Sequence, residues 1–240
     1  MTKLRKKVNA GDVIAIGDIH ARYDVLAAAL KWLNGTGARV ILLGDLIDRG
    51  GEDMKVLDKV KELMDDPGSE GLESFNVLMG NHERMFMDAV ESSETMWGYN
   101  SLMLWVKNGG NLKQFEEMKA HYEWIKQLPI YMTVGDTMFI HAGILPGGNP
   151  KNDLGHSRSV ENLLWMREPF LSVGPELHKW TDKVKKVVHG HTIVGKEPDV
   201  TKDRIGIDTG AVFSGILTAY NATRDTYWQI KKKETVDIFS

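Results

Sequence analysis

Residues 40–43 are all apolar, and the loop that follows them, residues 44–50, carries two carboxylates and one guanidinium. The apolar run has the length and composition of a buried strand. A buried strand places the residues after it at a fixed point, and so much charge at that point is costly unless something binds there. We therefore expect a ligand site at this strand end, with Asp45 between two metal ions.

Apolar runs alternate several times with segments of helical periodicity. Three such βα units in a row predict a parallel sheet with right-handed crossovers. The length of 240 residues suits a single α/β domain, which we expect to span residues 1–240. Strands are expected at residues 13–16, 40–43, 75–79, 137–140, 187–188 and 205–207, helices at about 26–33, 53–64, 85–90 and 163–167, and a closing hairpin at 216–220 and 226–230.

Residues from about 91 to 127 have helical periodicity and are rich in Trp and Met, so we predict a helical insertion. Its large aromatic side chains are Trp97, Trp105 and Trp124. These side chains either line a substrate groove or pack within the core and the insertion. We expect packing, because aromatic side chains contribute most through buried surface.

Composition excludes several classes of protein. The 30 basic and 33 acidic side chains leave a formal charge of −3, so neither nucleic acid nor an acidic membrane is an expected partner. The sequence has no cysteine, which excludes disulfides, thiolate zinc sites and a cysteine nucleophile. No run has the length of a signal-peptide core or a membrane span, so we expect a cytoplasmic location. Any metal ligands must be His, Asp, Glu or Asn.

Five apolar runs end in side chains that can bind a metal ion. Strand ends on one side of an open α/β sheet converge on a crevice, so we expect these side chains to lie together. Of the eight histidines, only His121, His156 and His178 lie away from such strand ends, and we expect them at the surface or in packing. Mixed carboxylate, imidazole and amide ligation suits Mn²⁺, Fe²⁺ or Zn²⁺. The candidates are Asp18, His20, Asp45, Asn81, His82, His141, His189 and His191.

The loops after the first three strands resemble the signature motifs of the metallophosphoesterases. They read Gly-Asp-Ile-His at 17–20, Gly-Asp-Leu-Ile-Asp-Arg-Gly at 44–50 and Gly-Asn-His-Glu at 80–83. More narrowly, they resemble the phosphoprotein phosphatase family, which includes the eukaryotic serine/threonine phosphatases. Residues 190–192 and 207–213 are most similar to its bacterial and bacteriophage-lambda-type members. The resemblance covers residues 17–213 and implies a β-sandwich core flanked by helices.

The resemblance also implies two divalent cations that share Asp45. Mn²⁺ is the expected metal, with Fe²⁺, Zn²⁺, Ni²⁺ and Co²⁺ as alternatives. His191 is preferred to His189 as a ligand because it lies in the Gly-His-Thr match. The implied ligands of the first ion are Asp18, His20 and Asp45, and those of the second are Asp45, Asn81, His141 and His191.

The resemblance also implies which residues bind the phosphate. Arg49 is expected to bind the phosphate, with help from Asn81 and from Arg167 in the Trp-x-Arg-Glu segment; Arg158 is the alternative to Arg167. A planar guanidinium suits this task because it can donate two parallel hydrogen bonds to phosphate oxygens.

His82 follows Asn81 directly, so it can reach the site without binding metal, and we expect it to be the general acid. Asp48 is expected to keep the His82 imidazole protonated and oriented. The alternative is structural, with His82 at a helix start and Asp48 capping a loop.

The function implied is that of a metal-dependent phosphomonoesterase, a serine/threonine protein phosphatase with dual specificity left open, which uses a hydroxide that bridges two metals. The substrate is then a phosphorylated protein or peptide, or a small phosphoester. Residues 141–144 also resemble the symmetrical dinucleoside tetraphosphate hydrolases, although those relatives usually lack Asp48 and have Asp in place of Glu83. A non-catalytic scaffold that binds a partner protein is a third reading, and the oligomeric state stays open.

Overall fold

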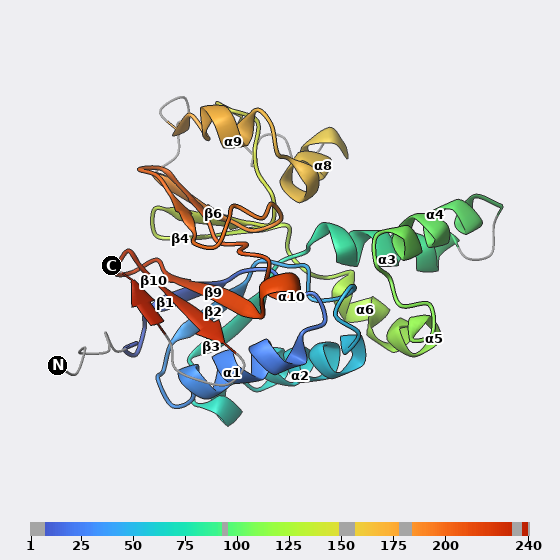
Figure 1. Cartoon of the computed structure of the whole chain (residues 1–240), viewed down its shortest axis with the longest axis horizontal. Helices are drawn as coiled ribbons and strands as arrows, with labels where there is room; N and C mark the ends of the chain where they lie inside the picture. The colour runs from blue at the N-terminus through green and yellow to red at the C-terminus, as the bar shows by residue number, and fades with distance from the viewer. Residues whose placement is uncertain (1–7, 93–95, 149–156, 178–183, 232–236, 240) are drawn as a thin grey trace.

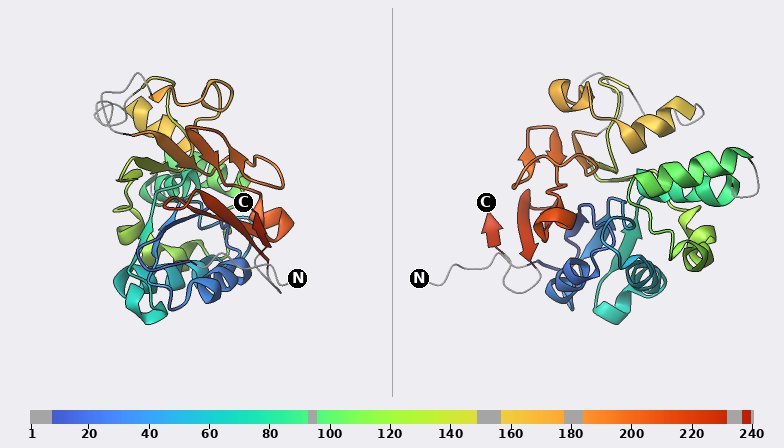
Figure 2. Two further views of the ribbon diagram at one scale, coloured as in Figure 1. Left: turned by 90° about the vertical axis from the view of Figure 1, so that its left-hand side faces the viewer. Right: turned by 45° about the vertical axis from the view of Figure 1, so that its right-hand side comes forward.

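The computed structural model describes residues 8–92, 96–148, 157–177, 184–231 and 237–239. Two β-sheets lie face to face, and helices cover the outer face of each sheet (Figure 1). Figure 2 shows the same layers from two other sides. This architecture confirms the predicted α/β class with a β-sandwich core flanked by helices. Within the described residues, no helix is both long and apolar enough to cross a membrane.

The first sheet has six strands. They are β1 (Val13–Ile16), β2 (Arg39–Leu42), β3 (Ser74–Val77), β9 (Ile216–Asn221), β10 (Thr226–Lys231) and β11 (Asp237–Phe239). Their order is β11-β10-β9-β1-β2-β3. Strands β1, β2 and β3 are parallel, whereas β9 and β10 form an antiparallel hairpin that extends the sheet beside β1. The predicted βα units and the predicted closing hairpin are both confirmed.

The second sheet has five strands in the order β4-β5-β6-β8-β7. They are β4 (Tyr131–Val134), β5 (Thr137–Ile140), β6 (Lys186–His189), β7 (Asp199–Val200) and β8 (Arg204–Gly206). Because β5, β6 and β8 pair in parallel with one another, the predicted ligand-bearing strands belong to two sheets and not to one open sheet. The sequence did not predict β4 and β7, which are edge strands and lack the continuous apolar run of a doubly buried strand.

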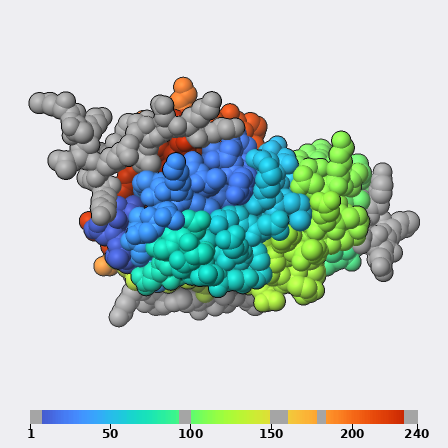
Figure 3. Space-filling view, turned by 90° about the horizontal axis from the view of Figure 1, so that it is seen from below, coloured from blue at the N-terminus to red at the C-terminus, as the bar shows by residue number. Residues whose placement is uncertain are grey.

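Helices form the outer layers. They are α1 (Tyr23–Leu33), α2 (Asp53–Asp65), α3 (Asn81–Ser92), α4 (Met96–Lys107), α5 (Phe115–Met118), α6 (Tyr122–Ile125), α8 (Ser157–Trp165), α9 (Phe170–Val173) and α10 (Ala211–Ser214), with 3-10 turns at Pro67–Glu70 and Lys119–His121. Helices α1 and α2 cover the first sheet, and α8 and α9 cover the second (Figure 1). Figure 3, seen from the side of α1 and α2, shows the green segment that contains α5 and α6 at one end of the molecule.

Strand β1 shows how the layers are held together. Ile14 and Ile16 are fully buried in the apolar core that the first sheet shares with α1 and α2. Val13 and Ala15 point the other way, into the core between the two sheets. Because both faces of β1 are buried, its sequence is uniformly apolar and does not alternate with polar residues.

The predicted helical insertion corresponds to the end of α3 and to α4, α5 and α6, between β3 and β4. Trp105 is fully buried, with its ring centroid 5.8 Å from that of Phe86 and 5.2 Å from that of Phe115. Trp124 is half-buried and packs against this part of the core. The packing role is therefore confirmed for both tryptophans, whereas the side chain of Trp97 lies outside the described residues.

Candidate active site

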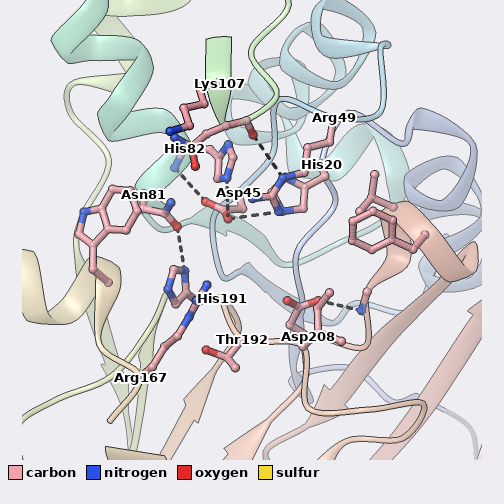
Figure 4. A pocket seen from close by; sticks show the side chains of 16 residues that line it. His20, Asp45, Arg49, Asn81, His82, Lys107, Arg167, His191, Thr192 and Asp208 are labelled. Carbon is pink, nitrogen blue, oxygen red and sulfur yellow. Dashed lines mark hydrogen bonds and ion pairs between the residues drawn. The ribbon is translucent and has the colours of Figure 1, made fainter. Parts of the chain in front are cut away.

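The loops that follow strands of both sheets meet at one pocket of about 540 Å³ (Figure 4). Four of its non-glycine lining residues have a left-handed backbone, with φ of 48° at His20, 50° at Asp45, 69° at Arg49 and 65° at His191. Such a backbone costs a non-glycine residue about 1–2 kcal/mol, and this kind of strain concentrates at functional sites. The loop conformations thus direct these side chains into the pocket at some cost in stability.

Asp45 lies at the centre of the site. Its Oδ2 is 3.5 Å from Nε2 of His20, and its Oδ1 is 3.3 Å from Nε2 of His141. Asp45 belongs to two groups of possible metal ligands, one with His20 and His82 and the other with His141 and His191, and within each group the ligand atoms lie within 4.8 Å of one another. A carboxylate shared in this way is what two cations about 3.5–4 Å apart require.

Asn81 joins the second group through its side-chain oxygen. This Oδ1 is 2.9 Å from Nε2 of His141 and 2.9 Å from Nδ1 of His191. Asn81 is the first residue of α3, so the end of β3 and the start of the helix fix its position. An amide oxygen, a carboxylate and two imidazoles therefore converge on one point, which fits a borderline or hard divalent cation.

Backbone carbonyls orient two of the histidine rings. Nδ1 of His20 is 3.0 Å from the carbonyl oxygen of Ile47, and Nδ1 of His141 is 2.9 Å from that of Leu43. A carbonyl can only accept, so each Nδ1 carries the proton and Nε2 faces the pocket. Burial lowers the pKa of His20 to about 3 despite the nearby charge of Asp45, so its Nε2 is unprotonated at neutral pH.

His141 has the opposite protonation. Burial by itself lowers its pKa, but the charge of Asp45, with that of Asp18 and Glu83, outweighs burial and raises the pKa to about 10. The proton on His141 thus balances a buried group of carboxylates. A cation held at the same place would supply that positive charge instead, and His141 would then be neutral.

Asp18 lies behind the pocket. Both of its oxygens accept the backbone N–H of His191, at 3.1 and 3.0 Å, so it ties the loop after β1 to the loop after β6. Burial raises the pKa of Asp18 well above its usual range, and the charge of Asp208 adds to this effect. Asp18 is absent from both groups of possible ligands among the described residues, although its carboxylate contacts the backbone of the candidate ligand His191.

Asp208 is a pocket residue for which the sequence reasoning proposed no role. It is buried, follows β8 closely and lines the pocket, and burial raises its pKa to about 6. The sequence could have indicated Asp208 as a site residue, because it follows the apolar run 205–207 just as Asp18 follows the first apolar run.

A buried pair of side chains lies beside the ligand groups. Nδ1 of His82 is 2.6 Å from Oδ2 of Asp48, and the indole N–H of Trp105 donates to Oδ1 of the same carboxylate at 2.9 Å. Burial lowers the pKa of His82, but the charge of Asp45 and the hydrogen bond to Asp48 outweigh it, and the pKa is raised. These interactions favour the protonated imidazole, and the helical insertion supports Asp48 through Trp105.

Glu83, the last residue of the third motif, has a structural role. Its carboxylate accepts the backbone N–H groups of Asp45 at 2.8 Å, Leu46 at 2.8 Å and Gly80 at 2.9 Å. Gly80 is also required for its size, because a Cβ there would lie 2.3 Å from the backbone nitrogen of Asp45. The loops after β2 and β3 are thus joined through one buried carboxylate.

Arg49 is held by the insertion. Its backbone N–H donates to the carbonyl of Gly109 at 2.9 Å, and its Nε donates to the carbonyl of Asn108 at 3.4 Å. Its Nη1 is 2.7 Å from Nε2 of His20, which places the guanidinium at the mouth of the ligand site. Figure 4 shows Arg49 and Arg167 on opposite sides of the pocket.

Arg167 is exposed and lines the pocket together with Trp165, which is 41% exposed. The side chain of Arg158, the alternative to Arg167, lies outside the described residues. His189 is fully buried behind the pocket, 5.1 Å from Phe170 between ring centroids, in the structural position expected of it.

Among the remaining histidines, His121 is buried within the insertion, where its Nδ1 accepts the indole N–H of Trp124 at 2.9 Å and its Nε2 is 3.1 Å from Asp58. Its expected packing role is confirmed. His156 and His178 lie outside the described residues.

Residues 11–209 match the family model of the calcineurin-like phosphoesterases. The match covers most of the chain, so the protein belongs to this family of metallophosphoesterases. It is a hydrolase of phosphate esters that uses divalent metal ions, and the two ligand groups around Asp45 are candidates to hold them.

Relatives within the family differ in the substrates for which they are named. A serine/threonine-protein phosphatase 1 of Salmonella typhimurium is 27% identical over 220 residues, which cover 86% of this chain and 89% of the relative. A symmetrical bis(5'-nucleosyl)-tetraphosphatase of Dechloromonas aromatica is 27% identical over 176 residues, covering 71% of this chain and 59% of the relative. The structure of a cold-active protein-tyrosine phosphatase of a psychrophilic Shewanella shares the fold, with a TM-score of 0.61, 18% identity and coverage of 98% and 82%.

Proposed function

We propose that this chain is a protein phosphatase that hydrolyses phosphoserine and phosphothreonine esters with two divalent ions, Mn²⁺ being the expected metal. The observation that supports this choice most is the buried pair of His82 and Asp48, 2.6 Å apart. A serine or threonine alkoxide is strongly basic and needs a proton as it leaves, which a positioned general acid supplies. A nucleotide that leaves from a phosphoanhydride is weakly basic and gains little from that proton. A built-in proton donor thus favours a phosphoester.

The side chains of the pocket divide the remaining work. When bound, the two cations supply a nucleophile at neutral pH by lowering the pKa of a water molecule. Arg49 and Arg167, on opposite sides of the pocket, bind the phosphoryl oxygens and neutralise their charge. His82 donates its Nε2 proton to the leaving oxygen, and Asp48 keeps the imidazole charged and oriented.

Hydrolysis of a dinucleoside tetraphosphate is the second candidate. Trp165 stands 41% exposed on the pocket wall, and an exposed indole can stack against a nucleobase. The Dechloromonas relative, named for that reaction, matches at the same identity as the Salmonella phosphatase. The lining of the pocket is therefore compatible with both a phosphoester and a dinucleoside tetraphosphate. The proton donor favours the phosphoester, because only its leaving group needs a proton.

The test compares kcat/KM for a phosphoserine peptide with kcat/KM for diadenosine tetraphosphate, both with Mn²⁺. We expect the phosphopeptide to be the better substrate. Faster, symmetrical cleavage of the tetraphosphate contradicts the proposal and supports the second candidate. Failure to hydrolyse p-nitrophenyl phosphate with Mn²⁺, Ni²⁺ or Co²⁺ indicates a non-catalytic scaffold.

Replacing Trp105 by Phe tests whether the hydrogen bond from Trp105 to Asp48 helps to position the proton donor His82. The variant keeps an aromatic ring against Phe86 and Phe115 but loses the hydrogen bond from Nε1 to Asp48. Losing a hydrogen bond to a buried charge of this kind is expected to slow the step that depends on it by about tenfold. The kcat for the phosphoserine peptide should therefore fall by about that factor. Turnover of p-nitrophenyl phosphate, whose leaving group needs no proton, should change much less.

Trp124→Phe is the matched control, because it removes an indole hydrogen bond of the same length to His121, away from the pocket. We expect this control to retain the wild-type ratio of the two rates. Equal losses on both substrates in Trp105→Phe mean that Trp105 serves the fold and does not position the acid.

A further inference from the structure

Lys107 is a third cation of the pocket, besides the two arginines. It is the last residue of α4 and lines the same pocket as Arg49 and Arg167. Figure 4 shows Lys107 on the side of the pocket that carries His82. Two guanidinium groups already flank the phosphoryl group in the proposed reaction. A third positive charge is therefore more than a simple phosphomonoester requires.

The backbone around Lys107 is fixed to the catalytic loop. Two residues before it, Trp105 is fully buried and bonded to Asp48, and directly after it, the carbonyls of Asn108 and Gly109 accept hydrogen bonds from Arg49. Lys107 thus extends from a rigid turn, and its ammonium group can reach only the part of the pocket near this turn.

The charge of Lys107 is available to a ligand. Its side chain is exposed, and no carboxylate of the described residues lies within ion-pair distance of it. By contrast, Lys55 and Lys61 of α2 and Lys119 of the insertion each contact a glutamate or aspartate on a neighbouring turn. An unpaired ammonium group at the wall of a cleft attracts anions.

The position of the proton donor, His82, determines how the substrate is oriented in the pocket. The leaving oxygen must face His82 to receive its proton, so the group that departs lies on the side of Lys107, whereas Arg49 and Arg167 bind the phosphoryl group that is transferred. We propose that Lys107 forms an anion subsite for the leaving group, and that the enzyme prefers phosphoesters whose leaving group carries a carboxylate or phosphate near the scissile phosphorus. This inference rests on the proposed function and names the substrate class of that site.

Two phosphoserine peptides test the subsite. They differ only in the residues beside the phosphoserine, which are Asp in one peptide and Asn in the other. We expect the wild-type enzyme to prefer the acidic peptide by about 3- to 10-fold in kcat/KM, mostly through KM, because the contact is at a partly screened cleft wall. In Lys107→Met the preference should disappear. Lys113→Met, an exposed lysine of the same insertion outside the pocket, should retain it.

Diadenosine tetraphosphate provides a second arm, because its leaving group carries phosphate. A loss confined to the acidic peptide identifies a carboxylate as the anion, and a loss confined to the tetraphosphate identifies a polyphosphate chain; either result supports the subsite. The inference is wrong if Lys107→Met changes none of the rates. It is also wrong if all rates fall by one factor, including that of p-nitrophenyl phosphate, since Lys107 then contacts the transferred phosphoryl group.

Wild-type turnover of p-nitrophenyl phosphate is measured alongside these substrates. Its leaving group carries no carboxylate or phosphate and makes no use of Lys107, so its hydrolysis reports on the proposed function alone. A protein that hydrolyses it but shows no dependence on Lys107 retains the proposed function and refutes the subsite.

Discussion

Replacing Asp45 by Asn is expected to reduce kcat/KM by about 10³-fold or more and to remove at least one bound metal. Each oxygen of Asp45 faces a different histidine, His20 at 3.5 Å and His141 at 3.3 Å. An amide offers one oxygen and no negative charge, so it cannot bridge two cations. The loss corresponds to several kcal/mol of transition-state stabilisation, which is what a metal ion contributes. Metal analysis of the purified variant and its turnover of p-nitrophenyl phosphate provide the measurements.

Asp65→Asn is the control for this change, because Asp65 is exposed at the end of α2 and pairs only with Lys61 among the described ion pairs. It should bind metal and turn over substrate as the wild type does. Full metal content in Asp45→Asn, with activity intact, would rule out Asp45 as the bridging ligand.

Replacing His82 by Asn is expected to lower kcat for a phosphoserine peptide by about 10²–10⁴-fold, which is the usual contribution of a general acid. Turnover of p-nitrophenyl phosphate should fall far less, because nitrophenolate leaves without a proton. Metal content should stay at the wild-type level. His82 loses its link to Asp48 in this variant, whereas the other side chains of the pocket keep their partners.

The metal analysis decides between two roles for His82. Its Nε2 lies 3.9 Å from Oδ2 of Asp45, near enough for His82 to belong to the first ligand group by geometry. We assign it to proton donation because its pKa is raised and Asp48 engages its other nitrogen. A variant that loses metal and loses activity equally on both substrates would show that His82 is a ligand. His121→Asn, a buried histidine of the insertion, controls for loss of stability.

Much of the site could be predicted from local sequence. Asp45, Asn81 and His141 each follow a largely apolar run that becomes a strand, so the fold itself delivers them to one end of the sandwich. The layers could be predicted for the same reason, since a strand buried on both faces is continuously apolar. The argument from strand ends alone placed the ligands in one open sheet, however, because apolar runs do not reveal which strands pair.

Contacts between distant segments could not be predicted. Trp105 was expected to pack, and it does, but its indole N–H also reaches Asp48, which is 57 residues away in the chain. Nothing in the residue types near Trp105 indicates that partner. Asp208 was overlooked for a different reason, because a carboxylate after a short strand has many ordinary roles in turns.

The segment from Trp105 to Gly109, at the end of α4, contributes no residue to the two groups of possible metal ligands, yet it contacts both Asp48 and Arg49. In the proposed mechanism, this short segment therefore supports two separate steps, protonation of the leaving group and binding of the phosphate. Changes in this segment can alter which esters are cleaved while the metal-binding residues stay the same. In an enzyme of this architecture, selectivity and metal chemistry can evolve independently, and a designer who wishes to retune the substrate range can begin with the insertion and leave the metal centre untouched.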